Sequence, residues 1–116
     1  MSEIAIQAGV KNRLRYVAPA VKMVAIPNAG KRTQWAAMQA KKEGLATGFP
    51  DCLFLWPDGG IAFVEFKAAK GRLSDNQAEW IERLHLDGHK VTVARSVEEA
   101  LAFLRACGAP VMEQPA

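Results

Sequence analysis

The sequence predicts an α/β fold in which helices flank a mixed central β-sheet, and two observations lead to this prediction. The chain has 116 residues, of which 50% are hydrophobic, so it can bury the core of one domain. Its local patterns give the element order α-β-α-β-β-α-β-α, which is typical of helices packed on a mixed sheet. This composition also excludes disorder over the whole chain.

The first helix and the first strand are expected at residues 3–17 and 21–26. Apolar side chains recur at helical spacing over 3–17, and Ser2 is a suitable N-cap. Pro19 ends this helix, because proline cannot continue a helix interior. Residues 21–26 are rich in β-forming side chains, and Pro27 begins the turn that ends the strand.

A second helix and a β-hairpin follow. Residues 33–43 are expected to be helical, with Gly44 as the C-terminal stop. The hairpin is the clearest local signal, because two β-rich runs at 52–56 and 61–68 flank the turn sequence PDGG at 57–60.

Two more helices are each expected to begin at a capping box. The first box is SDNQ at residues 74–77, and its helix ends at Gly88. Residues 91–94 form the last strand. The second box is SVEE at residues 96–99, and its helix ends before Gly108.

The chain reads as one domain over residues 1–108, with residues 109–116 as a flexible C-terminal tail. Apolar runs such as 52–56 fall far short of the ~20 residues that a membrane helix needs, and the N-terminus shows no signal peptide. Cys52 and Cys107 match neither a disulfide framework nor a zinc site. A cytoplasmic protein without a membrane partner is therefore expected.

Charge is distributed unevenly along the chain. Residues 1–50 carry eight basic and two acidic side chains, a net charge of +6. Residues 51–116 carry seven basic and ten acidic side chains, a net charge of −3. Two interpretations follow: the first half binds a polyanion, or its cations form a solvated helix face.

The candidate chemistry lies in the hairpin. Side chains alternate along a strand, so Glu65 and Lys67 point to one side while Phe66 joins the apolar face. Asp51 precedes the neighbouring strand, so the hairpin can bring its carboxylate near that of Glu65. Two converging carboxylates suit Mg²⁺ or Mn²⁺, and a neighbouring lysine can orient water or neutralise phosphate charge. The alternative is a Glu–Lys ion pair on a half-exposed edge strand.

Gln77 is a polar side chain on an apolar helix face. It shares that face with Ile81 and Leu84, so its amide points toward the core. Two interpretations stay open: Gln77 is only a capping-box residue, or it meets Lys67 or a substrate phosphate at the site.

Four motifs with short spacings resemble those of the VRR-NUC domain, the virus-type replication-repair nuclease branch of the PD-(D/E)xK superfamily. They are GFPD at 48–51, VEFK at 64–67, GRLSDNQ at 71–77, and Gly88 followed by SVEEA at 96–100. The resemblance is strong over residues 48–104 and weaker over residues 1–47. It implies a restriction-endonuclease-like core.

The resemblance also implies roles for individual residues. Asp51 and Glu65 bind the metal ion, with the backbone carbonyl of Phe66 as a further ligand. Lys67 is the catalytic lysine, and Gln77 is the glutamine of the site.

The family further expects a glutamate on the first helix, and Glu3 is the match. Glu3 shares a face with Ile6 and Val10, so it can point inward as a metal ligand. As a first-turn acid it can equally complement the helix dipole.

The resulting prediction is a Mg²⁺- or Mn²⁺-dependent DNA endonuclease. The resemblance adds a homodimer that resolves four-way (Holliday) junctions in DNA repair, in the cytoplasm of a bacterium or phage-infected cell. The alternative is an inactive nuclease-like module that binds DNA in a replication-repair complex. The cations expected to contact DNA are Lys31, Arg32, Lys70 and Arg72.

Overall fold

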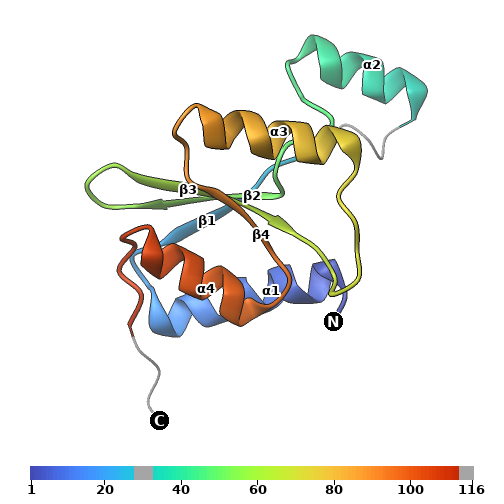
Figure 1. Ribbon diagram of the computed structural model, residues 1–116. Coiled ribbons are helices and arrows are strands. Elements are labelled where there is room, and N and C mark those ends of the chain that lie inside the picture. Colours follow the sequence, from blue (N-terminus) through green and yellow to red (C-terminus); the bar gives the residue numbers. More distant parts are fainter. Residues whose placement is uncertain (28–32, 113–116) are drawn as a thin grey trace.

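A computed structural model describes residues 1–27 and 33–112, and it confirms the α/β fold with a mixed sheet (Figure 1). The four strands lie in sequence order: β1 (Lys22–Ala25), β2 (Cys52–Trp56), β3 (Gly60–Phe66) and β4 (Val91–Ala94). The β1–β2 and β2–β3 pairs are antiparallel, whereas β3 and β4 are parallel. β3 therefore lies inside the sheet, and β1 and β4 are its edges.

Four helices surround this sheet: α1 (Glu3–Val17), α2 (Gln34–Lys42), α3 (Asp75–Leu86) and α4 (Val97–Ala106). Helices α1 and α4 cover one face, α3 covers part of the other, and α2 lies beyond α3 (Figure 1). The main core fills the space between α1, α4 and the sheet, with Phe54, Phe66 and Leu104 among its buried side chains. Within the described part of the chain, no helix has the length and apolar character needed to cross a membrane.

The helix starts follow the expected caps, with one difference. Ser2 and Ser74 accept hydrogen bonds from backbone N–H groups of their first turns, and the Ser74 capping box is complete. The Ser96 box is only half formed, because the Glu99 carboxylate accepts from the N–H of Arg95 at 2.6 Å rather than from that of Ser96. Glu99 therefore holds the residue before the cap.

The hairpin forms as expected, but its second strand is shorter. Asp58 and Gly59 adopt positive φ values of 68° and 80°, as tight hairpin turns require. β3 ends at Phe66 rather than at Ala68. Its neighbour β4 ends at Ala94, the partner of Phe66, so no β4 residue is left to pair with Lys67 or Ala68.

The packed part of the chain extends past the expected domain boundary. Ala109 is buried in the core, and the N–H of Met112 donates to the carbonyl of Val17 at 2.6 Å. Residues 109–112 thus pack against α1 and α4 instead of leaving the domain, because their apolar side chains cover the end of the core. The remaining tail, residues 113–116, lies outside the described residues.

Candidate active site

Asp51 is fixed between two strands by a backbone hydrogen bond. Its Oδ2 accepts from the N–H of Phe66 at 2.8 Å, which links the start of β2 to the end of β3. The backbone carbonyl of Asp51 accepts from the N–H of Ile26 at 2.8 Å, next to β1. These bonds hold the carboxylate beside Glu65, as the hairpin predicted.

Glu65 and Lys67 are buried, with exposed fractions of 1% and 8%. Glu65 lies on the interior strand β3, and Lys67 directly follows that strand. The alternative of an ion pair on a half-exposed edge strand is therefore wrong. Phe66 points into the apolar core between them, as expected. Burial of a carboxylate and an ammonium has a large desolvation cost. Two such buried side chains close together therefore indicate a functional site.

Gln77 serves the helix cap and the site together. Its Oε1 accepts from the N–H of Ser74 at 2.9 Å, which completes the capping box. Its Nε2 donates to Glu65 Oε2 at 3.2 Å. The two interpretations of Gln77 are therefore compatible, but its partner at the site is Glu65 and not Lys67.

Gly48 allows the segment that carries Asp51 to approach the start of α3. It has φ of 87°, and a Cβ atom there would lie 2.7 Å from Asn76 Cβ and 2.8 Å from Gln77 N. A side chain at position 48 would push the loop away from the helix. The glycine of the GFPD motif thus brings the elements of Asp51 and Gln77 together.

The site has a strong electrostatic signature. Burial is the main cause that raises the pKa of Glu65 from 4.5 to about 8, and the charge of Asp51 raises it further while Lys67 lowers it. Burial, with the charges of Asp51 and Glu65, also raises the pKa of the Cys52 thiol to about 12. With no cation present, Glu65 therefore holds a proton at neutral pH.

The two carboxylates fit a divalent cation. Glu65 Oε1 is buried and has no hydrogen-bond partner among the described residues, so one oxygen is available as a ligand. A cation would also offset the negative charge of Asp51, which adds to burial in raising the pKa of Glu65. Hard carboxylate oxygens are the ligands that Mg²⁺ and Mn²⁺ prefer. The carbonyl of Phe66 as a further ligand stays a prediction.

Glu3 does not join these carboxylates in a three-ligand group. Within residues 1–27 and 33–112, no three acidic, histidine or cysteine side chains come together as a metal-binding group. Glu3 is exposed in the first turn of α1, where its charge can complement the helix dipole. It lies near enough for its charge to raise the pKa of Glu65 slightly, so it borders the site.

The expected DNA-binding cations divide into two pairs. Lys70 and Arg72 are exposed in the loop between β3 and α3, which begins at Lys67. Their contact with DNA stays a prediction. Lys31 and Arg32 lie outside the described residues.

Arg95 is a residue of the site region that the sequence did not reveal. Its guanidinium donates from Nη1 to the carbonyls of Ala68 and Gly71, both at 2.7 Å, and more weakly to that of Ala69. It thus closes the turn that follows Lys67. No sequence signal marks this role, because the acceptors are backbone carbonyls more than twenty positions earlier in the chain.

Loss of the Arg95 side chain should loosen this turn. We expect Arg95→Met to destabilise the fold by about 2 kcal/mol, because charged hydrogen bonds to part-buried carbonyls are lost. Chemical denaturation measures this change. Arg95→Lys, which keeps the charge but only a single donor group, should recover less than half of it. Full recovery by lysine would show that the positive charge stabilises the turn and that the guanidinium hydrogen bonds to two carbonyls are not needed.

Gln77→Ala should reduce activity more than stability. Its capping-box contribution is about 1 kcal/mol, whereas its bond to Glu65 orients a carboxylate of the site. We expect at least a tenfold loss of cleavage per folded molecule, measured beside denaturation curves. Asp75→Ala in the same helical turn is the matched control, and equal activities of the two variants would return Gln77 to a purely structural role.

A family model described as the VRR-NUC domain matches residues 3–98. A solved structure described as a VRR_NUC domain is similar with a TM-score of 0.64 and 22% identity, over 89% of this chain and 94% of that chain. Another, described as a VRR_NUC domain protein, has a TM-score of 0.71 and 19% identity, over 90% and 86%. Among curated proteins, nothing matches this chain.

Proposed function

Because this chain belongs to the VRR-NUC domain family, we propose that it is a metal-dependent endonuclease that hydrolyses phosphodiester bonds in DNA. One observation carries the proposal: Asp51 and Glu65 lie together at the open end of the β2–β3 hairpin, near enough to Lys67 for its charge to act on Glu65, and Glu65 and Lys67 are buried. A structural ion pair needs no second carboxylate, and the added negative charge opposes burial.

The residues of the site have separate tasks in this proposal. Asp51 and Glu65 would hold Mg²⁺ or Mn²⁺, which would stabilise the charge that develops on the phosphate. Gln77 keeps Glu65 in place through its amide. Lys67 orients the attacking water and balances the negative charge of the phosphate. The exposed Lys70 and Arg72 contact neighbouring phosphates and position the strand.

A cleavage assay with linear, nicked, flapped and four-way-junction DNA tests the proposal. We expect cleavage with Mg²⁺ or Mn²⁺ and none with EDTA. Lys67→Ala should abolish cleavage while DNA binding stays within a few fold, because the exposed cations supply most of the phosphate attraction. Arg105→Ala, which removes an exposed cation of α4, is the control. DNA binding without cleavage by the wild type would favour the inactive DNA-binding module instead.

We further propose that two copies act together as a homodimer. Three exposed apolar side chains, Val24 on β1, Leu55 on β2 and Ile61 on β3, share the sheet face opposite α1 and α4. Leu55 and Ile61 pair directly, and Val24 lies diagonally from Leu55, whose direct partner on β1 is Lys22. An exposed apolar sheet surface of this kind is typical of an interface. Two sites related by a two-fold axis suit paired incisions across a four-way junction.

The dimer proposal predicts a change in mass and in substrate preference. Leu55→Glu should give a monomer by light scattering at micromolar concentration and should lose paired incisions in a junction. Leu86→Glu, at a 74% exposed leucine on α3 outside this surface, should leave the dimer intact. A monomer mass for the wild type would refute the dimer, and equal cutting of duplex and junction would refute the substrate preference.

A further inference from the structure

The outer side of β1 carries backbone groups that no other strand uses, because β1 is an edge of the sheet. The N–H of Ile26 donates to the carbonyl of Asp51, and hydrogen-bonded pairs alternate with non-bonded pairs along an antiparallel ladder. Ala25 and Met23 are therefore at non-bonded positions, and their N–H and C=O groups point away from β2. No loop or cap group of residues 1–27 and 33–112 bonds to them.

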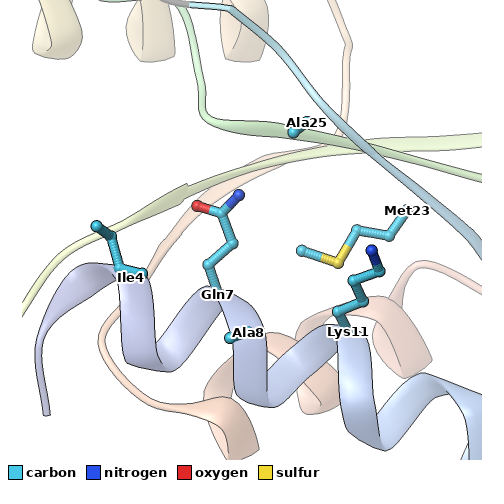
Figure 2. A pocket seen from close by; sticks show the side chains of 6 residues that line it. All are labelled: Ile4, Gln7, Ala8, Lys11, Met23 and Ala25. Carbon is cyan, nitrogen blue, oxygen red and sulfur yellow. The ribbon is translucent and has the colours of Figure 1, made fainter.

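A groove runs along this edge, between β1 and α1. Helix α1 packs on β3 and α4, and two neighbouring cavities of about 280 and 200 Å³ lie between it and β1. Lys11 and Met23 line both cavities, which we name together the α1–β1 groove. In Figure 2, Gln7 and Lys11 project from α1 toward the sheet.

The length of the α1–β1 groove suits an extended peptide. One cavity is lined by Ala25 and the other by Val21, so the groove follows the whole of β1. A strand advances about 3.3 Å per residue, so this stretch corresponds to about five residues of an added strand.

The groove also has apolar surface for the side chains of such a strand. Met23 and Ala25 pair with core residues of β2, so their side chains lie on the sheet face that α1 covers. Ile4 is 80% exposed at one end of the groove. A strand added to β1 would direct every second side chain into the groove, where these apolar groups would contact it.

The rim of the groove is basic. Lys11 and Arg15 are exposed cations of α1 that line it, and the exposed Lys22 begins β1. Neither cavity has an aspartate or glutamate among the described side chains that line it. Acidic side chains on the added strand would complement these cations, whereas the β1 edges of two copies would bring like charges together.

The position of the groove separates it from the candidate active site. Gln77 of α3 binds Glu65, so the carboxylate lies on the sheet face that α3 covers. The α1–β1 groove lies on the opposite face. A nucleic acid shares the negative charge of an acidic peptide, but it lacks the repeating N–H and C=O groups that pair with a strand edge.

We infer that the α1–β1 groove binds an extended acidic segment of another protein, which adds to β1 as a further strand. The backbone groups of Met23 and Ala25 bind its main chain, the groove takes its apolar side chains, and the basic rim takes its acidic ones. The inference goes beyond DNA cleavage, because it gives the protein a surface for a protein partner.

Fluorescence polarisation with synthetic peptides tests the groove. The probe is a short fluorescein-labelled peptide of alternating aspartate and leucine, and a peptide of alternating lysine and leucine is its control. We expect saturable binding of the acidic probe that weakens with salt, and binding of the basic peptide at least about tenfold weaker. Equal binding of the two peptides would overturn the inference.

N-methylated probes test strand addition on the wild-type protein. In an antiparallel segment the groove-facing leucines bond to Met23 and Ala25, so methylation of the leucine N–H groups should abolish binding while methylation of the aspartate N–H groups should not. A parallel segment reverses this pattern. Any result other than loss with one set alone would overturn strand addition.

Substitutions locate the binding surface. Ala25→Pro removes an outward N–H that the sheet does not use, and proline is tolerated at such edge positions. We expect it to weaken probe binding at least about tenfold, whereas Ala25→Ser, which keeps the N–H, should bind like the wild type. Lys11→Glu should weaken binding at least about fivefold, and Lys42→Glu, at an exposed cation of α2, should not. Equal affinities within either pair would contradict the assigned surface.

Other occupants of the groove give different results. A loss of the homodimer in Ala25→Pro would assign the edge to a second copy and overturn the inference. A single-stranded oligonucleotide that displaces the probe from the wild type, and that binds Lys11→Glu more weakly but Ala25→Pro unchanged, would assign the groove to nucleic acid and overturn it as well.

The inference and the nuclease function fail in different experiments. Ala8→Phe fills the groove from an exposed position of α1, so it should lose probe binding and keep wild-type cleavage of DNA. Ala102→Phe, at an exposed alanine of α4, should keep both. Unchanged probe binding in Ala8→Phe would contradict the groove alone, and a wild type that binds the probe but cuts no DNA would contradict the nuclease alone.

Discussion

Glu65→Gln should abolish DNA cleavage, with a loss of at least about a thousandfold, while the fold stays intact. Without a cation the pKa of Glu65 is about 8, so the native side chain is protonated at neutral pH and glutamine has nearly the same shape and charge. The substitution removes an anionic ligand and no core volume. Cleavage assays and thermal unfolding at pH 7 in EDTA measure the two effects.

Glu79→Gln is the matched control for this variant. Glu79 is an exposed carboxylate on α3 that pairs with Arg83, so its loss should leave cleavage unchanged. Cleavage by Glu65→Gln near the wild-type rate would exclude Glu65 from the chemistry. A large fall in the melting temperature in EDTA would instead show that the ionised carboxylate supports the fold.

Asp51→Asn should lose metal-dependent activity and should raise stability in EDTA. The amide oxygen of asparagine can still accept from the N–H of Phe66, so the link between β2 and β3 remains. The charge that raises the pKa of Glu65 disappears, so the repulsion between the two side chains is relieved. Calorimetric titration with Mg²⁺ and thermal unfolding measure these changes.

The stability of Asp51→Asn in EDTA should also depend less on pH than that of the wild type. The folded wild type keeps a proton on Glu65 that the unfolded chain releases near pH 4.5, so its stability in EDTA should fall as pH rises from about 4.5 to about 8. In Asp51→Asn the pKa of Glu65 is lower, so this fall should be smaller. Asp58→Asn, in the exposed hairpin turn, should behave like the wild type. Full Mg²⁺ affinity in Asp51→Asn would remove Asp51 from the ligand set.

Local signals were sufficient for most of the fold. The hairpin follows from two β-rich runs around PDGG, and Ser2 and Ser74 mark helix starts because a cap satisfies backbone groups within four residues. The approach of Asp51 to the end of β3 was also predictable, since antiparallel strands joined by a tight turn have a fixed register. These features depend on residues that are close in the sequence.

Long-range packing decided what the sequence left open. The strand order places β3 inside the sheet, and only this order buries Glu65 and raises its pKa. The joint role of Gln77 requires the start of α3 to lie against Glu65, which the approach at Gly48 allows.

The sequence by itself therefore determined the element types, the hairpin and the candidate residues Asp51, Glu65 and Lys67, because each depends on neighbours along the chain. Only the tertiary structure decided that Arg95 closes the turn after Lys67 and that Glu3 stays outside the pair of carboxylates. Both outcomes depend on how α1, β3 and β4 pack, and side-chain spacing within one element carries no information about the distance to another.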